Sequence, residues 1–320
     1  MKYLIILLSI LTFVISQQRP VSTYSIVAYD EKTGDLGVAV QSHWFSVGSV
    51  VPWAKAGIGA VATQSFTKIE YGPDGLNLME EGLTAKEALE KLVAADTGRA
   101  VRQVGMVDVN GNTSVHTGEK CIEFAGHKTG KNYTVQANLM ESPTVWHMMA
   151  LAFETADGDL ADRMMRALEA AEAEGGDLRG KQSAAMLIVS GEPTGVPWKD
   201  VVLDLRVEDH PEPLKQLRRL IRIHKAYTHA NKGDHYMETG NIEKALVEYN
   251  HSSSFYPENP ELKYWTAVTL VGEGRLEEAL PIFKDVFKEA PQLKILTPRM
   301  VPSGLLPDDR STLNKILTAE

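Results

Sequence analysis

Near its C-terminal end the chain repeats itself with a period of 34 residues. Gly240 begins the segment GNIEKAL and Gly274 begins GRLEEAL, and Pro257 and Pro291 keep the same offset. A fixed period of this length is typical of repeat architectures, in which each unit must stack on a neighbour to bury its apolar face. Because the patterning is helical from about residue 213 onward, we expect this part of the chain to form an all-α domain.

The repeated side chains also correspond, since Ala245 matches Ala279 and Tyr249 matches Phe283. A period of 34 with a glycine turn, a small residue, an aromatic residue and a terminal proline resembles the tetratricopeptide repeat, and this resemblance implies two helices per unit. Two copies cover residues 226–293. Since about three units are needed for a stable stack, the flanking segments EPLKQLRRLIRIHKA and DDRSTLNKIL are expected to be capping helices.

Two roles are open for this helical domain. Its repeats can offer a concave surface to a protein or peptide partner, as stacked repeats do. Alternatively, its helices only form a cap that packs on the preceding domain, and the capping segments fill the groove themselves.

Residues 23–207 have a different pattern, in which short β-branched segments alternate with helical ones. YSIVAYD and DLGVAVQS flank a turn with Gly34, and QVGMVDV and TSVHTG are joined by Asn110 and Gly111, so two hairpins are predicted. The segment LTAKEALEKLVAAD begins with a capping-box pattern and predicts a helix. These features indicate an α/β domain with largely antiparallel sheets. No strand is followed by a GxGxxG turn, which argues against a dinucleotide-binding fold.

The N-terminal segment MKYLIILLSILTFVISQQ has the layout of a secretory signal peptide. Its apolar run ends at Ile15 and is too short for a membrane span, which takes about 20 residues. We expect cleavage after Ser16 and export of the mature chain, with an uncleaved membrane tether as the alternative. The expected organisation is a leader at 1–16, an α/β domain at 17–222 and a helical domain at 223–320.

Composition excludes several classes of function. The net charge of −9 and the absence of a basic cluster argue against a nucleic-acid partner. Cys121 is the only cysteine, so there is no intramolecular disulfide, and it is interpreted as a buried structural residue. No cofactor motif is present, and no metal site is expected. That expectation rests on four histidines without paired spacing: His43, His116, His127 and His147.

Several long segments of the first domain resemble one family. They are TYSIVAYDEKTGDLGVAVQSHWFSVGSVVPWAKAGIGAVATQ, YGPDGLNLMEEG, HTGEKC, GGDLRGKQSAAMLIV and LDLRVEDHPEPLKQLRRL. Together they closely resemble domain-of-unknown-function family 1028 over nearly all of residues 23–222. That family is similar to the N-terminal-nucleophile (Ntn) hydrolases, so the resemblance implies a four-layer αββα sandwich with largely antiparallel sheets.

The same resemblance makes Thr23 the candidate nucleophile. In Ntn hydrolases the first residue of the processed chain attacks an amide, and its free α-amine, with a pKa of about 7.7 to 8, removes the hydroxyl proton. Thr23 begins the first strand, and Ser25 is the competing hydroxyl on the same strand face. Cleavage after Ser16 would leave six residues ahead of Thr23. The mechanism therefore needs a second cleavage between Ser22 and Thr23.

Proteasome-like Ntn proteins also use an Asp and a Lys to support the nucleophile. The resemblance places Gln41 at the Asp position, which argues against proteasome-type peptidase activity. It places Lys55 at the Lys position, where a positive charge would lower the proton affinity of the hydroxyl. The alternative for Lys55 is a solvated loop charge.

Substrate contacts are expected from polar residues at strand ends and in one glycine-containing turn. In GGDLRGKQSA, Arg179 could clamp a substrate carboxylate and Asp177 could orient it, or the two could form an ion pair that only fixes a loop. The full set of expected substrate-binding residues is Ser25, Gln41, Gln64, Ser65, Asn138, Asp177, Arg179 and Gln182.

Two hypotheses follow. The first is an exported amidohydrolase in which Thr23 attacks a small carboxylate-bearing amide or short peptide, with Lys55 tuning the nucleophile. The second is a non-catalytic protein that binds a small ligand in a polar pocket and recruits a protein partner through its repeats. A homo-oligomer is compatible with both.

Overall fold

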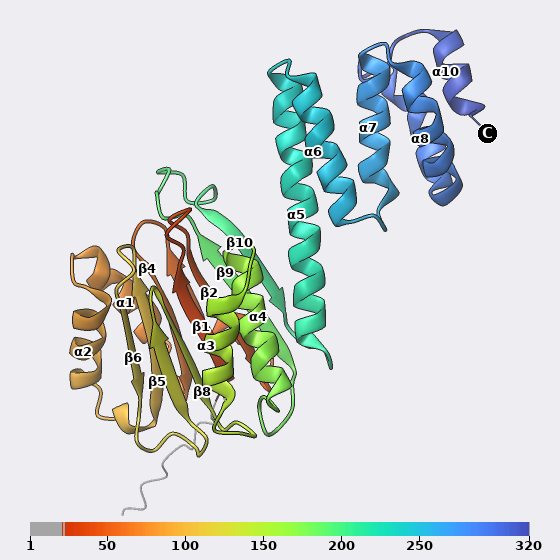
Figure 1. The fold of residues 1–320 in the computed structure, drawn as a ribbon. Coiled ribbons are helices and arrows are strands. Elements are labelled where there is room, and N and C mark those ends of the chain that lie inside the picture. The colour runs from red at the N-terminus through yellow and green to blue at the C-terminus, as the bar shows by residue number, and fades with distance from the viewer. Residues whose placement is uncertain (1–20, 22, 320) are drawn as a thin grey trace, which may run out of the picture. The chain divides into compact units, whose positions relative to one another are not determined.

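A computed structural model describes residue 21 and residues 23–319 (Figure 1). The expected leader lies outside the described residues. The chain divides into two compact units, one ending at Leu214 and the other beginning at Lys215. The expected boundary at residue 222 lies inside the helix Pro213–Glu238, whose first two residues belong to the first unit.

The first unit contains a six-stranded antiparallel sheet with β1 in its interior. In spatial order its strands are β10 (Val201–Val207), β9 (Ser183–Val189), β2 (Leu36–Ser42), β1 (Thr23–Tyr29), β8 (Tyr133–Asn138) and β7 (Gly126–Gly130). The second, four-stranded antiparallel sheet consists of β3 (Pro52–Lys55), β4 (Gly59–Ser65), β5 (Arg102–Asp108) and β6 (Thr113–Thr117).

Both expected hairpins are present. Gly34 has a φ of +81° in the turn between β1 and β2, and Gly111 has a φ of +78° between β5 and β6, so both positions need the left-handed backbone that glycine adopts freely. The Asp108 carboxylate accepts the backbone N–H of Asn110 at 2.9 Å and stabilises the second turn. Strands β3 and β7 were not expected, because each is short and contains proline or glycine.

The two sheets pack face to face through apolar side chains from both, including Val27, Val40 and Ala62. Helices α1 (Tyr71–Glu80) and α2 (Ala85–Ala95) cover the outer face of the four-stranded sheet. The predicted capping box of α2 is confirmed, with Thr84 accepting the N–H of Glu87.

Helices α3 (Val145–Thr155) and α4 (Leu160–Ala173) cover the outer face of the six-stranded sheet (Figure 1). A Cβ at Gly37 of β2 would lie 2.7 Å from Met164 Cε, so α4 approaches the sheet closely there. The predicted mixed α/β class with antiparallel sheets is thus confirmed, whereas the Ntn-hydrolase character of the unit stays a prediction.

The second unit is helical, as predicted. Its helices are α5 (Pro213–Glu238), α6 (Ile242–Phe255), α7 (Pro260–Gly272), α8 (Leu276–Glu289), α9 (Pro291–Leu296) and α10 (Arg310–Leu317). Helices α6 and α8 begin and end 34 residues apart, in phase with the sequence repeat. A short 3₁₀ helix, Thr297–Met300, follows α9, and two others in the first unit span Val47–Ser49 and Arg99–Val101.

The helical unit has its own apolar core. Phe283 of α8 is fully buried, and its ring lies 5.7 Å from that of Tyr264 on α7 and 5.4 Å from that of Phe287. Gly240 and Gly274, with φ of +72° and +75°, end the helices that precede α6 and α8. Membership of the tetratricopeptide class stays a prediction. Within the described part of the chain, no helix combines the length and apolar character that a membrane span needs.

We expect Phe283→Ala to lower the free energy of unfolding of the helical unit by about 3–5 kcal/mol, because the substitution removes a buried ring and leaves a cavity. Ile295→Ala is the control, because Ile295 is 62% exposed; it should change the same quantity by less than about 0.5 kcal/mol. Urea unfolding followed by circular dichroism measures both. Equal losses in the two variants would contradict the assigned core.

Candidate functional site

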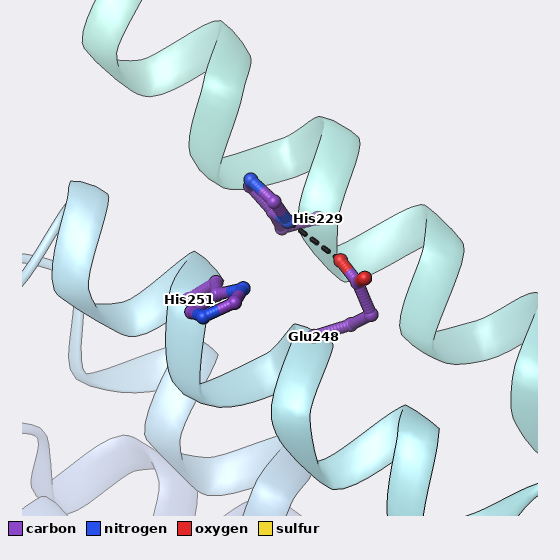
Figure 2. A group of neighbouring side chains, drawn as sticks. All are labelled: His229, Glu248 and His251. Atoms are coloured by element: carbon purple, nitrogen blue, oxygen red, sulfur yellow. Dashed lines mark hydrogen bonds and ion pairs between the residues drawn. The ribbon is translucent and has the colours of Figure 1, made fainter.

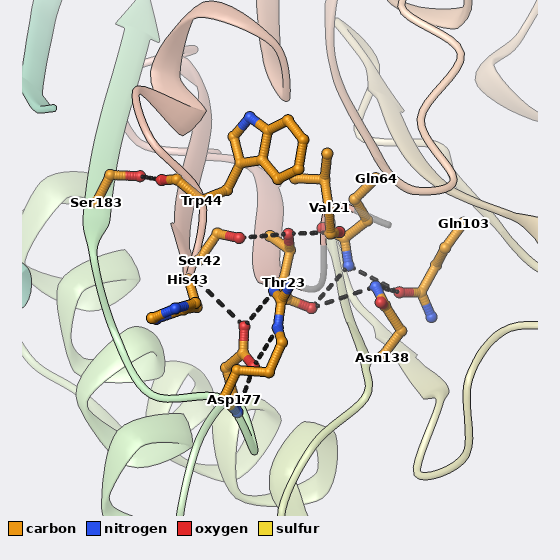
Figure 3. A network of polar contacts seen from close by, with 11 residues as sticks. Val21, Thr23, Ser42, His43, Trp44, Gln64, Gln103, Asn138, Asp177 and Ser183 are labelled. Atoms are coloured by element: carbon orange, nitrogen blue, oxygen red, sulfur yellow. Dashed lines mark hydrogen bonds and ion pairs between the residues drawn. The ribbon is translucent and has the colours of Figure 1, made fainter. Parts of the chain in front are cut away.

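Thr23 lies at the start of β1, between its partner residues Ser42 on β2 and Asn138 on β8. Its side chain is completely buried. The hydroxyl donates to the carbonyl oxygen of Val21 at 2.8 Å, and Ser42 Oγ lies 3.2 Å away (Figure 3). The candidate nucleophile therefore has a second hydroxyl beside it, that of Ser42, which no sequence motif indicates.

The chain ahead of Thr23 is held against the four-stranded sheet. Val21 and Ser65 form an antiparallel bridge, with N–H to carbonyl distances of 2.7 and 3.0 Å. Val21 is itself only 4% exposed. In the chain as it stands, the Thr23 nitrogen belongs to a peptide bond and its hydroxyl is out of reach of solvent.

Side-chain amides connect Thr23 to both sheets. Gln64 Nε2, from β4, donates to the Thr23 carbonyl oxygen at 3.1 Å and to Gln103 Oε1 at 2.7 Å. Asn138 Nδ2 donates to the same Gln103 oxygen at 2.9 Å and lies 3.5 Å from the Thr23 carbonyl oxygen. We call Gln64, Gln103 and Asn138 the amide cluster (Figure 3). Gln64 and Gln103 come from the four-stranded sheet and Asn138 from β8 beside Thr23, and together they fix the Thr23 backbone.

Ser25 lies two residues further along β1, and its hydroxyl makes two hydrogen bonds. Its hydroxyl donates to Gln64 Oε1 at 2.6 Å and accepts from Gln136 Nε2 at 2.6 Å. A buried hydroxyl with both bonds satisfied is a structural link rather than a competing nucleophile.

Two non-glycine residues beside this site have left-handed backbone. Ser65, which pairs with Val21, has a φ of +68°, and Leu139, which follows Asn138, has a φ of +57°. Such conformations cost about 1–3 kcal/mol each and cluster at functional sites. Arg102 supports the first of them, because its guanidinium donates to the carbonyl oxygen of Phe66.

Asp177 lies beside the end of β2 and is bridged to Met140, just after β8. Its buried carboxylate accepts the backbone N–H of His43 at 3.2 Å, and Arg179 donates to it from Nε at 3.1 Å and Nη2 at 2.9 Å. This ion pair fixes the turn and places the Arg179 charge next to the end of β2. Gln182 is not brought to Thr23, because its amide donates to Asp209 at 3.0 Å.

Two expected roles are corrected by the strand geometry. Lys55 pairs with Gly59 at the start of β4, whereas Ser65 ends that strand, so six residues at about 3.4 Å each separate Lys55 from the Thr23 end by about 20 Å. Its ammonium group instead forms an ion pair with Glu80 at 2.5 Å. Lys55 therefore cannot tune the Thr23 hydroxyl.

Gln41 faces away from Thr23. Since neighbouring residues on a strand point to opposite faces, Ser42 shares the face of Thr23, and Gln41 shares the face of Tyr24, its partner on β1. The Tyr24 hydroxyl donates to Glu172 of α4 at 2.7 Å, and burial, together with the Glu172 charge, raises the pKa of Tyr24 well above its usual value. Gln41 is thus buried under the helices rather than in the site.

Cys121 has the surroundings of a structural residue. Its thiol lies 3.4 Å from the carbonyl oxygen of Arg102, and burial raises its pKa, which disfavours the reactive thiolate.

The family profile described as "Family of unknown function (DUF1028)" matches residues 23–217. The chain belongs to domain-of-unknown-function family 1028. A crystal structure of protein SPO2555 from Silicibacter pomeroyi, described with the same family, is 29% identical in sequence. The likeness covers 63% of this chain and 88% of SPO2555, with a TM-score of 0.56. No curated protein matches the chain. The family match thus begins at Thr23, the candidate nucleophile.

We expect Gln103→Leu to lower the free energy of unfolding by about 2–4 kcal/mol, because Gln64 Nε2 and Asn138 Nδ2 both lose their shared acceptor. Gln182→Leu is the control. It breaks one surface hydrogen bond and should cost less than about 0.5 kcal/mol. Urea denaturation of both variants measures the difference, and a Gln103→Leu protein as stable as the control would contradict the role of the amide cluster.

Proposed function

We propose that this protein is an exported Ntn-type amidohydrolase whose nucleophile is Thr23. The substrate class is a small amide or short peptide that carries a carboxylate. The first unit is proposed to have the Ntn four-layer arrangement, and the second to be a tetratricopeptide-like domain that holds a peptide partner.

The observation that carries the proposal is the position of Thr23. It begins an interior strand, its side chain points between two stacked sheets, and the amide cluster holds its carbonyl group. An N-terminal nucleophile must be held in this way, because its own amine and hydroxyl have to keep a fixed mutual geometry.

Activation requires removal of the preceding residues. Hydrolysis of the Ser22–Thr23 bond would free the Thr23 α-amine, and loss of the Val21–Ser65 bridge would uncover the hydroxyl. The amine then takes the hydroxyl proton as the oxygen attacks the substrate carbonyl carbon, and it returns that proton to the leaving amine. Water hydrolyses the resulting ester and regenerates Thr23. Lys55 has no part in this scheme.

Arg179 is proposed to orient the substrate. Asp177 holds the guanidinium through two bonds, so that its position is preorganised beside the end of β2. A substrate carboxylate would then be attracted to the same charge that fixes the turn.

The second candidate is a ligand-binding protein without catalysis. It is favoured by the complete burial of the Thr23 hydroxyl in the unprocessed chain and by the absence of any described lysine bonded to it. The two candidates differ in one property, the N-terminal residue of the mature protein.

Intact mass and N-terminal sequencing of the exported protein should give a chain that begins at Thr23. In that form Thr23→Ala should reduce amide hydrolysis by about 10³-fold or more, because both nucleophile and acyl acceptor are lost. Thr33→Ala, in an exposed turn, should leave the rate unchanged. A mature chain that keeps residues before Thr23 would support the ligand-binding candidate instead.

Substrate orientation can be tested separately with a panel of amides with and without a free carboxylate. Arg179→Gln should raise KM about tenfold or more for the carboxylates, which corresponds to one lost charge-assisted contact, and should leave neutral amides unaffected. An equal effect on both groups of substrates would show that Arg179 only supports the turn.

A further inference from the structure

Three metal-ligand side chains converge between α5 and α6 of the helical unit. They are His229 on α5 and Glu248 and His251 on α6, and one donor atom of each lies within 4.8 Å of the others (Figure 2). Among the residues that the structure describes, no other group of three His, Cys, Asp or Glu donors is this close. The expectation of no metal site rested on other histidines, all of them in the first unit.

The helical geometry explains why these residues meet. Glu248 and His251 are three residues apart and therefore share one face of α6. Glu-x-x-His is the spacing with which helices present a carboxylate and an imidazole to one ion in helical-bundle metal proteins. His229 faces them from the neighbouring helix, and its Nδ1 lies 2.6 Å from Glu248 Oε2.

Two of the three groups are already held in place. The side chains of His229 and Glu248 are only 24% and 19% exposed. The His229 ring stacks on Phe255, with centroids 5.3 Å apart and an interplanar angle of 12°. His251 is exposed, and its ring lies edge-on to His229 at 5.2 Å. Two ligands held in place and one exposed ligand, whose side chain can turn, can close on an ion without moving a helix.

Solvent can reach the carboxylate side of the group. A cavity of about 480 Å³ borders Glu248 and is also lined by Asn231, Lys232 and Tyr236. Lys232 adds a positive charge there, which weakens cation binding, but the cavity leaves room for a water on an open coordination position.

We propose that His229, Glu248 and His251 bind one divalent transition-metal ion, with Zn²⁺ the best fit. Two imidazoles and one carboxylate are a ligand set that zinc uses with a water in the fourth position. Calcium and magnesium prefer all-oxygen ligands, so the two imidazoles disfavour them. The ion would join α5 to α6.

The coordination geometry requires small movements. Bonds of about 2.0–2.1 Å place tetrahedral ligand atoms about 3.3–3.4 Å apart. The His229–Glu248 contact must therefore open slightly and give up its proton, while the exposed His251 ring rotates inward. The competing interpretation is a simple His229–Glu248 hydrogen bond, to which His251 contributes nothing.

Zinc titration of the full mature chain decides between these interpretations. The protein is purified without a histidine tag, stripped with a chelator and titrated by calorimetry, and Co²⁺ is added to a second sample to record its visible d–d absorption. We expect one equivalent of Zn²⁺, and a cobalt spectrum of the intense, tetrahedral type.

His251→Ala and Glu248→Gln should each weaken zinc binding at least about tenfold and abolish the tetrahedral cobalt spectrum, because each removes one of three ligands. His147→Ala, at an exposed helical histidine in the first unit, should bind as the unaltered chain does. Zinc should also raise the Tm of the unaltered chain and not that of His251→Ala. The proposal is overturned if no saturable binding occurs, or if His251→Ala binds one equivalent with the affinity of the unaltered chain.

Discussion

Gln64 makes the hydrogen bonds on which the arrangement of the first unit depends. Its amide reaches from the four-stranded sheet to the Thr23 carbonyl in the six-stranded sheet, and it shares the Gln103 oxygen with Asn138. In the dry space between two sheets, an unpaired amide costs more than a paired one contributes. These hydrogen bonds therefore favour the observed stacking of the two sheets, which places Thr23 at the end of the interface.

The same constraint separates the residues that form the site from those that do not. Thr23, Ser42 and the amide cluster face the gap between the sheets, whereas Gln41 points into the helical layer. Lys55, on β3, pairs with Gly59 at the other end of β4. The position of a residue along a strand fixes the sheet face on which it lies and its distance from the end of the sheet. Residues that a family resemblance assigns to one site, such as Thr23 and Lys55, can therefore lie about 20 Å apart.

The helical unit contains residues that follow the 34-residue repeat and residues that depart from it. Its 34-residue spacing recurs in the bounds of α6 and α8, and equivalent positions fill the core. The histidine and glutamate groups are not part of that repeat, because position 248 corresponds to Ile282 and position 251 to Asp285. A feature that breaks the repeat pattern is free to serve a function that the stacking does not need.

The sequence by itself determined the two kinds of architecture, the hairpin turns at Gly34 and Gly111, the α2 capping box and the family. These depend on periodicity and on local backbone preferences, which act between residues close in the chain. Only the tertiary structure decided that Val21 covers Thr23, that Ser42 and Gln103 join the site, that Lys55 does not, and that His229 meets Glu248 and His251. Each of these depends on the pairing of elements far apart in the chain, and that pairing is set by burial and register rather than by local sequence.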